Sequence, residues 1–318
     1  KMTRKSETEP FFIVGPVRSG TTLLRLLIGH HPEICRCEEM DYVTPFLAIH
    51  PNGVPKKKYL HELSIDRGFR LSGYKVDNRL SFLQLARSFL EQRQEMDGRR
   101  LVGATVHHYY SLLPKVWAEA RFIYVNRDPR DVTRSCVVMG WGGTAWHAAK
   151  IWSDAQDEWE RLKTLVPAQR LHEVRFDELL IEPERVLSNL TSFLGVPYVA
   201  TMQDIEKDTT YRRPSPLEAQ SWRTKASERE IQEVEARLGP ERILQAGYPL
   251  SGLPALSMGL GSRLEIAITD LKQRVRFKIG RYGLWLWFAG VVSRRLPIQP
   301  LQDYFRLKSN DVDNLYLK

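Results

Sequence analysis

Two separate segments of the sequence combine hydroxyl and arginine side chains in a way that suits phosphate binding, and the first of them also contains two glycines. Residues 15–22 read GPVRSGTT, and residues 127–135 read RDPRDVTRS. Backbone amides at a glycine-containing turn before a helix point toward an anion, and arginine forms charged hydrogen bonds with phosphate oxygens. The sequence therefore predicts an anionic ligand that is held at two phosphate-binding loops.

The first loop differs from the phosphate loop of nucleoside triphosphatases at one position. That loop has the spacing GxxxxGK[ST], and Thr21 stands here where the lysine should be. The cation that contacts the β- and γ-phosphates is thus missing, whereas Arg18 can supply charge and Thr21 and Thr22 can donate hydroxyl hydrogen bonds. Triphosphate chemistry is disfavoured and a shorter phosphosulfate remains feasible. A phosphate-loop kinase acting on a small molecule with ATP and Mg²⁺ is the alternative.

Strands that alternate with helices must position these loops. Apolar runs at 11–15, 121–125 and 172–176 predict strands, each followed by helical spacing, and the last helix should span 183–194 and stop at Gly195. This order predicts an α/β protein with a P-loop-like three-layer α/β/α fold and a central, mainly parallel sheet. Both loops then fall at the carboxyl ends of strands, where ligands bind in such folds.

Two further segments complete the organisation of the chain. Residues 141–162 predict an amphipathic helix with Trp152 and Trp159 in the core, while Trp141 and Trp146 could line an acceptor cleft. From about residue 255 the pattern changes to basic and aromatic helical stretches. We expect one domain at 10–252 and a helical C-terminal appendage at 255–318.

Composition limits the partners and the compartment. The net charge of +9 and the pI near 9.4 suit an anionic nucleotide, an acidic acceptor or an anionic membrane surface. The basic residues are scattered and no nucleic-acid-binding signature occurs, so no nucleic-acid partner is expected. Only three cysteines occur, and the polar start KMTRKSETEP contains no apolar signal core, so we expect a cytoplasmic location. Residues 283–292 are too few to span a bilayer.

The stretch FFIVGPVRSGTTLL resembles the 5′-phosphosulfate loop of sulfotransferases that use 3′-phosphoadenosine 5′-phosphosulfate (PAPS), especially the bacterial and tyrosylprotein-type branch. The similarity covers roughly residues 10–250. It implies that PAPS is bound, with 3′,5′-ADP as the product and without a metal. The 3′-phosphate should lie at Arg127 and Ser135, which keep the family spacing of eight positions, and adenine should stack on Phe176, where many members have tyrosine. The 5′-phosphosulfate should be held by Arg18, Ser19, Gly20, Thr21 and Thr22.

Sulfuryl transfer to a hydroxyl, or less favourably to an amine, requires in-line alignment and a general base near the acceptor proton. The resemblance offers two candidates: Glu39, at the position of the catalytic glutamate in tyrosylprotein-type enzymes, and His107, at that of the catalytic histidine in cytosolic enzymes. We favour Glu39 as the base with His107 assisting. Glu39 could instead merely face solvent, and His107 could be a core histidine with satisfied hydrogen bonds. A lysine that many relatives carry near Ala104 is absent.

The acceptor is not identified by the sequence: a carbohydrate, a lipid-linked molecule, a phenol and a peptide all remain open. In the appendage, arginines flank Trp285, Trp287 and Phe288. This composition predicts either an interfacial helix that lies on a membrane surface, which would make the enzyme peripheral there, or a packed helix pair at a homodimer interface.

Overall fold

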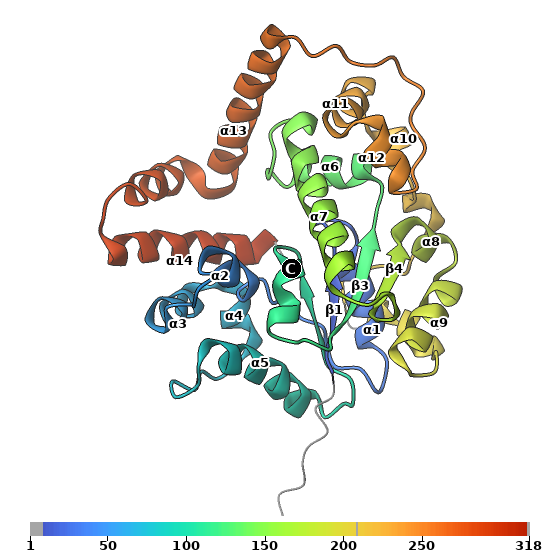
Figure 1. Cartoon of the computed structure of the whole chain (residues 1–318). Helices are drawn as coiled ribbons and strands as arrows, with labels where there is room; N and C mark the ends of the chain where they lie inside the picture. Colours follow the sequence, from blue (N-terminus) through green and yellow to red (C-terminus); the bar gives the residue numbers. More distant parts are fainter. Residues whose placement is uncertain (1–8, 208, 317–318) are drawn as a thin grey trace, which may run out of the picture.

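The structure is a computed structural model, and it describes residues 9–207 and 209–316. The polar segment KMTRKSETEP, from which a cytoplasmic location is expected, lies mostly outside the described residues. Figure 1 shows a central sheet with helices on both sides and a long helical arm at the C-terminal end. The sheet has the strand order β2-β1-β3-β4, and every pairing in it is parallel, with the strands β1 (Phe11–Val14), β2 (Gly103–Val106), β3 (Arg121–Asn126) and β4 (Leu171–Arg175).

The sheet is covered on both faces because its strands are apolar throughout. In β1, Phe12 and Val14 point into one hydrophobic cluster, whereas Phe11 and Ile13 point into another. The first cluster includes side chains of α5 (Phe82–Asp97) and α7 (Ala145–Leu165), and the second includes side chains of α1 (Thr21–Gly29) and α9 (Pro183–Leu194). The predicted three-layer α/β/α fold with a parallel sheet is confirmed.

The remaining helices complete the layers and the connections. Between α1 and β2 the chain forms α2 (Thr44–Ile49), α3 (Lys56–Ile65), α4 (Arg67–Ser72) and α5. After β2 follow a short 3₁₀ segment at Tyr110–Lys115, then α6 (Pro129–Val138) and α7. The later helices are α8 (Phe176–Ile181), α9, α10 (Trp222–Lys225), α11 (Glu228–Leu238), α12 (Pro240–Gln245), α13 (Leu260–Ser293) and α14 (Gln299–Tyr316).

Several local predictions agree with the structure in detail. Helix α9 spans the predicted residues, begins with Pro183 and ends before Gly195, whose φ of 76° is one that glycine adopts without strain. Trp152 and Trp159 of α7 are buried in the core, as expected, whereas Trp141 is exposed.

Two predictions about strands were wrong or incomplete. The third predicted strand was expected to reach Phe176, but β4 ends at Arg175 and Phe176 begins α8. Strand β2 was not predicted, because GATV contains only small and β-branched residues and no long apolar run. The chain before α2 also adds to this edge of the sheet, through parallel bridges of Ile34 with Leu101 and of Glu39 with Thr105.

The C-terminal helices contact the rest of the protein at two places. Helix α13 packs on the loop between α6 and α7, and α14 lies against α3, where Arg306 pairs with Glu62 and Asn310 donates to the carbonyl of Ile65. Within α13, Gly283 has φ 77° and ψ 156°, which kinks the helix. Within the described residues, no helix is long and apolar enough to cross a membrane. The boundary between the two predicted parts, at 252–255, stays a prediction.

Candidate active site

The first phosphate loop joins β1 to α1 at the carboxyl edge of the sheet. Gly20 occupies the N-cap position of α1 with φ 100°, and it has no side chain to cap the first helical amides. The first amides of a helix have no partner inside the helix, and the helix dipole favours negative charge there. Ser19 is fully buried, and its Oγ makes no hydrogen bond among the described residues. This end of α1 can therefore hold an anion.

The second phosphate loop is tied directly to the first. Arg18 Nε donates to Ser135 Oγ at 3.0 Å, and Arg127 donates through Nη1 to the carbonyl of Arg18, also at 3.0 Å. Arg18 has φ 67°, a left-handed conformation that costs a non-glycine residue about 1–2 kcal/mol. Ser135 lies inside α6 and not in a loop, nearly two helical turns after the start of that helix at Pro129. Residues predicted to bind opposite ends of one nucleotide thus lie together.

The Phe176 ring contacts both loops, through Gly20 of the first and Arg127 of the second. A Cβ atom added to Gly20 would lie 2.1 Å from the Phe176 ring, and the Arg127 guanidinium lies 4.4 Å from the ring centroid. The ring is almost completely buried by these contacts. The predicted stacking of adenine on Phe176 stays a prediction, and it would require Arg127 to share or leave the ring face.

Two other charged residues of the second segment have structural roles. Arg130 is buried and donates to both carboxylate oxygens of Asp128, and it also pairs with Glu235 and stacks on Trp222 at 3.8 Å. Asp131 accepts a hydrogen bond from Ser221. These pairs hold α10 and α11 beside α6, which keeps the second loop in place.

Glu39 lies at the edge of the sheet beside β2. The bridge between Glu39 and Thr105 makes residues 38–40 an added strand segment, in which neighbouring side chains point to opposite faces. Glu38 faces α5 and pairs with the buried Arg93. The carboxylate of Glu39 has no hydrogen bond or ion pair in the part of the chain that the structure describes. Of the two adjacent glutamates, only Glu39 is therefore available to a ligand.

His107 connects the first phosphate loop to Asp41. Its Nε2 lies 3.0 Å from Thr21 Oγ1, and its Nδ1 lies 2.8 Å from Asp41 Oδ2. Since an ionised carboxylate only accepts hydrogen bonds, Nδ1–H must be the donor in the second contact. Asp41 Oδ1 also accepts from the backbone amides of His107 at 2.8 Å and His108 at 3.1 Å. Both ring nitrogens of His107 are therefore engaged.

The pair of His107 and Asp41 stabilises the charged forms of both groups. Burial by itself would lower the pKa of His107, but the charge and the hydrogen bond of Asp41 outweigh burial and raise it. Burial would raise the pKa of the Asp41 carboxyl, but the charge and the hydrogen bond of His107 outweigh that effect and lower it. Glu39 also raises the pKa of His107, which places its carboxylate near the ring.

Arg25 is a site residue that the sequence analysis did not identify. It lies one helical turn after Thr21, and helical side chains point back toward the N-terminus, so it leans toward the phosphate loop. Its charge acts on both His107 and Cys37. Within residues 9–207 and 209–316 its guanidinium has no hydrogen bond or ion pair, and its Nε is buried. A half-buried cation without a partner is costly unless an anion binds there.

The residues present fit a nucleotide with two phosphate-like groups. Ser19 Oγ, Arg25 Nε and Arg127 Nε are buried polar atoms without a hydrogen-bond partner among the described residues. Buried polar groups normally have partners, and a bound anion at the two loops and the first turn of α1 would supply them here.

Comparison with known proteins identifies relatives of this chain. Residues 10–200 match the model of a family described as the sulfotransferase family. Protein-tyrosine sulfotransferase A of Caenorhabditis elegans is 24% identical over 213 residues, which cover 61% of this chain and 52% of that protein. Protein-tyrosine sulfotransferase 1 of Danio rerio is 26% identical over 203 residues, covering 59% and 53%. The chain thus spans about half the length of these curated relatives.

A solved structure shows the same fold. The sulfotransferase domain from the curacin biosynthetic pathway superposes with a TM-score of 0.51 at 20% identity, covering 76% of this chain and 99% of that one. The family match spans both phosphate loops, the Glu39 segment and His107. The chain belongs to the sulfotransferase family.

Proposed function

We propose that this protein transfers the sulfuryl group of PAPS to a hydroxyl group of an acceptor. One observation carries the proposal: the two phosphate loops are joined by the hydrogen bonds of Arg18 with Ser135 and of Arg127 with Arg18. A nucleotide with both a 3′-phosphate and a 5′-phosphosulfate needs two adjacent anion sites. A nucleoside triphosphate needs one loop with a lysine, and Thr21 stands at that position.

PAPS supplies an activated sulfuryl group attached to its 5′-phosphate. The amides at the start of α1, with Arg18, Ser19, Gly20, Thr21 and Thr22, would hold the 5′ end. Arg127 and Ser135 would hold the 3′-phosphate. Such contacts stabilise charge as it moves onto the leaving nucleotide, and they are already in place before the reaction.

Glu39 would act as the general base. It would accept the proton of the acceptor hydroxyl while the acceptor oxygen bonds to sulfur and the bond from sulfur to the 5′-phosphate oxygen breaks. Its carboxylate has no partner within the described residues, so it can meet an acceptor directly. Arg25, on the α1 side of the same space, would stabilise the sulfuryl oxygens during transfer.

His107 would act by positioning. Accepting a proton from an acceptor at Nε2 would require the loss of its contact with Thr21, so its bonds suit a different task. Held by Asp41, the ring would fix the Thr21 hydroxyl at the phosphate loop. This role matches the assisting function that the sequence analysis assigns to it.

For the acceptor class and for the role of the C-terminal segment, we propose a choice between a few alternatives. Two matched relatives are named as protein-tyrosine sulfotransferases, so a phenolic hydroxyl is one candidate acceptor beside sugar and lipid-linked hydroxyls. Leu284, Trp285 and Phe288 of α13 are exposed. These side chains support either contact with a membrane surface by a cytoplasmic enzyme or contact with a second copy of the chain.

Calorimetric titration with 3′,5′-ADP tests the donor site. We expect binding without metal, weakened at least about tenfold by combined Arg127→Ala and Ser135→Ala substitutions, because each removes a direct phosphate contact. Lys150→Ala is the matched control, since Lys150 lies on the surface of α7 and, among the described residues, pairs with Asp154 alone. Preference for ATP with Mg²⁺, or no binding of 3′,5′-ADP, would replace the proposal with the kinase alternative.

A further inference from the structure

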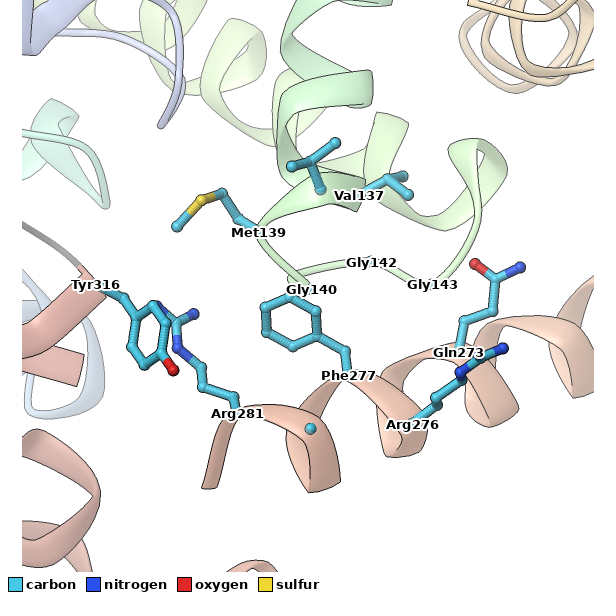
Figure 2. A pocket seen from close by; sticks show the side chains of 12 residues that line it. Val137, Met139, Gly140, Gly142, Gly143, Gln273, Arg276, Phe277, Arg281 and Tyr316 are labelled. Carbon is cyan, nitrogen blue, oxygen red and sulfur yellow. The ribbon is translucent and has the colours of Figure 1, made fainter. Parts of the chain in front are cut away.

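A pocket of about 670 Å³ lies between α13 and the loop that joins α6 to α7 (Figure 2). One wall contains Val138 and Met139 from the end of α6 and the loop that follows. The opposite wall contains Arg276, Phe277 and Arg281 of α13, and Tyr316 at the end of α14 completes the lining. Its volume falls in the usual range of about 300–1,000 Å³ for small-molecule sites.

The two walls are held in a defined position by glycine contacts. A Cβ atom on Gly140, which has φ 71°, would lie 2.1 Å from the Phe277 ring. A Cβ atom on Gly143 would lie 2.2 Å from the carbonyl oxygen of Asp270. Only glycine at these positions permits α13 to approach so closely. Figure 2 shows Phe277 directly opposite Gly140 across this contact.

A buried carboxylate fixes the same contact. Asp270 of α13 accepts hydrogen bonds from the amides of Gly143 at 2.7 Å and Thr144 at 3.2 Å, which are the amides at the start of α7. Arg274 balances its charge at 2.7 Å. The position of α13, and hence the shape of the pocket, follows from specific contacts rather than from loose apolar packing.

The lining combines positive charge with apolar surface. Among the residues that the structure describes, no acidic side chain lines the pocket. Arg276 is exposed and has no hydrogen bond or ion pair within the described ranges. The side chain of Arg281 is only 8% exposed and lies against the rings of Phe277 and Tyr316, and Asp313 is its one ion-pair partner among the described residues, at 3.3 Å. The ion pair is made by its Nε, and the contact does not meet hydrogen-bond geometry. These features fit a ligand with an anionic group and an apolar body.

The pocket adjoins the donor site through α6. The amide of Met139, which lines the pocket, donates to the carbonyl of Ser135 at 3.1 Å, so one helical turn separates the two. Val137 of the lining and Val17 of the first phosphate loop pack on the same hydrophobic cluster. A ligand here would therefore lie beside the end of the donor site that is proposed to hold the 3′-phosphate, and no residue of the two phosphate loops lines the pocket among the described residues.

We propose that this pocket binds the anionic end of the acceptor, an amphiphile whose negative group pairs with Arg276 and Arg281 and whose hydroxyl extends out of the pocket toward Glu39. The acceptor role rests on the proposed sulfotransferase function. The lining arginines, Arg276 and Arg281, belong to α13, and Tyr316 belongs to α14; both helices lie outside the family match at residues 10–200. Acceptor specificity varies among proteins of one fold, and residues outside the family match can therefore determine it.

Titration of the full chain with dodecanoate, below its micelle concentration, tests the pocket. Gly280→Leu should fill it, because a Cβ atom at Gly280 meets no atom within 4 Å. Gly261→Leu is the matched control, since Gly261 lies in the same helix, also in open space, outside the pocket. Arg276→Ala removes a lining cation, and Lys278→Ala removes a nearby exposed one that does not line the pocket.

We expect Gly280→Leu and Arg276→Ala each to weaken dodecanoate binding about tenfold or more, a change of about 1.4 kcal/mol, and both controls to bind as the parent does. Dodecyltrimethylammonium, with the same chain and opposite charge, should not bind. Binding only to phosphatidylglycerol vesicles, lost in Gly280→Leu, would identify a membrane lipid as the source of the ligand. Binding that neither pocket variant changes would overturn the inference.

Repeating the titration with saturating 3′,5′-ADP separates the inference from the proposed function. Simultaneous binding of both ligands is expected of a donor site and a distinct acceptor site. Displacement of dodecanoate by the nucleotide would contradict a separate acceptor pocket. If dodecanoate binds as predicted and 3′,5′-ADP does not bind at all, the proposed function is wrong. The pocket then remains a binding site for an anionic amphiphile, but its ligand is not a sulfuryl acceptor.

Discussion

Replacing Asp41 by asparagine tests the link between Asp41, His107 and the first phosphate loop. The Asp41 carboxylate accepts three hydrogen bonds, from His107 Nδ1 and from the amides of His107 and His108. In Asp41→Asn, one amide oxygen can still accept from the backbone, but the amide nitrogen would face the donor Nδ1–H. A hydrogen bond to a charged partner contributes about 1.5–3 kcal/mol, compared with about 0.5–1.5 kcal/mol for a neutral one.

The cost of the substitution must depend on pH, and the sign follows from the two pKa shifts. The raised pKa of His107 stabilises the fold below the ordinary value of 6.5, and this contribution is lost as pH rises through the folded pKa. The lowered pKa of Asp41 stabilises the fold above 3.8, and this contribution is lost as pH falls through its folded pKa. Between these two ordinary values both contributions are present.

We therefore expect Asp41→Asn to lower the free energy of unfolding, measured by urea denaturation, by about 1.5–3 kcal/mol near pH 9, once His107 is neutral and still donates to the charged carboxylate. The decrease should be larger near pH 5.5, where the charge of His107 adds to the hydrogen bond. Asp77→Asn is the control, because Asp77 pairs with Arg79, which stays charged across this range. An equal loss at both pH values, or a larger loss near pH 9, would refute the charged pair.

Three further predictions concern the loop, the unpaired cation and the exposed aromatic residues. Gly20→Ala should lower the free energy of unfolding by about 2–4 kcal/mol, because the new Cβ would meet the Phe176 ring and φ is positive; urea denaturation measures this. Arg25→Met should leave the free energy of unfolding unchanged or raise it, because Arg25 has no partner within the described residues. The same substitution should weaken the binding of PAPS, measured by calorimetry, and leave the binding of 3′,5′-ADP unchanged. Trp285→Ser with Phe288→Ser should change stability by less than about 0.5 kcal/mol and reduce sedimentation with anionic vesicles.

Each of these has a control and a contrary outcome. Gly73 also has a positive φ, of 75°, but a Cβ atom there would meet no neighbouring atom, so Gly73→Ala should lower the free energy of unfolding by only about 1 kcal/mol. An equally small decrease in Gly20→Ala would contradict the contact with the Phe176 ring. Loss of stability in Arg25→Met would show that a partner pairs with Arg25. Leu217→Ser removes an exposed apolar side chain far from α13 in the sequence, and an equal effect on vesicle binding would indicate non-specific adhesion.

The sequence predicts the elements whose signals are local. The first phosphate loop stands between an apolar strand and a helix, and α9 has proline at its start and glycine at its end, so pattern and turn chemistry locate both. Strand β2 lacks such a signal, because GATV forms a strand only through its pairing with β1. The register that brings Glu39 beside Thr105 likewise depends on this pairing.

The parts of the site that were missed depend on tertiary contacts. Arg25 reads as an ordinary charged position on a helix, and only its burial without a partner distinguishes it. Asp41 is separated from His107 by 66 positions, so their pairing has no local signal. The packing of α13 against Gly140 and Gly143 has no local signal either, because in the sequence both glycines look like parts of an ordinary flexible turn.

A crystal structure of the protein with 3′,5′-ADP tests the central claim most directly. We predict the 5′-phosphate at the amides that begin α1, and the 3′-phosphate within hydrogen-bond distance of Arg127 and Ser135, with Arg18 between the two loops. A nucleotide bound elsewhere, or a 3′-phosphate that contacts neither Arg127 nor Ser135, would contradict the account of a PAPS donor site.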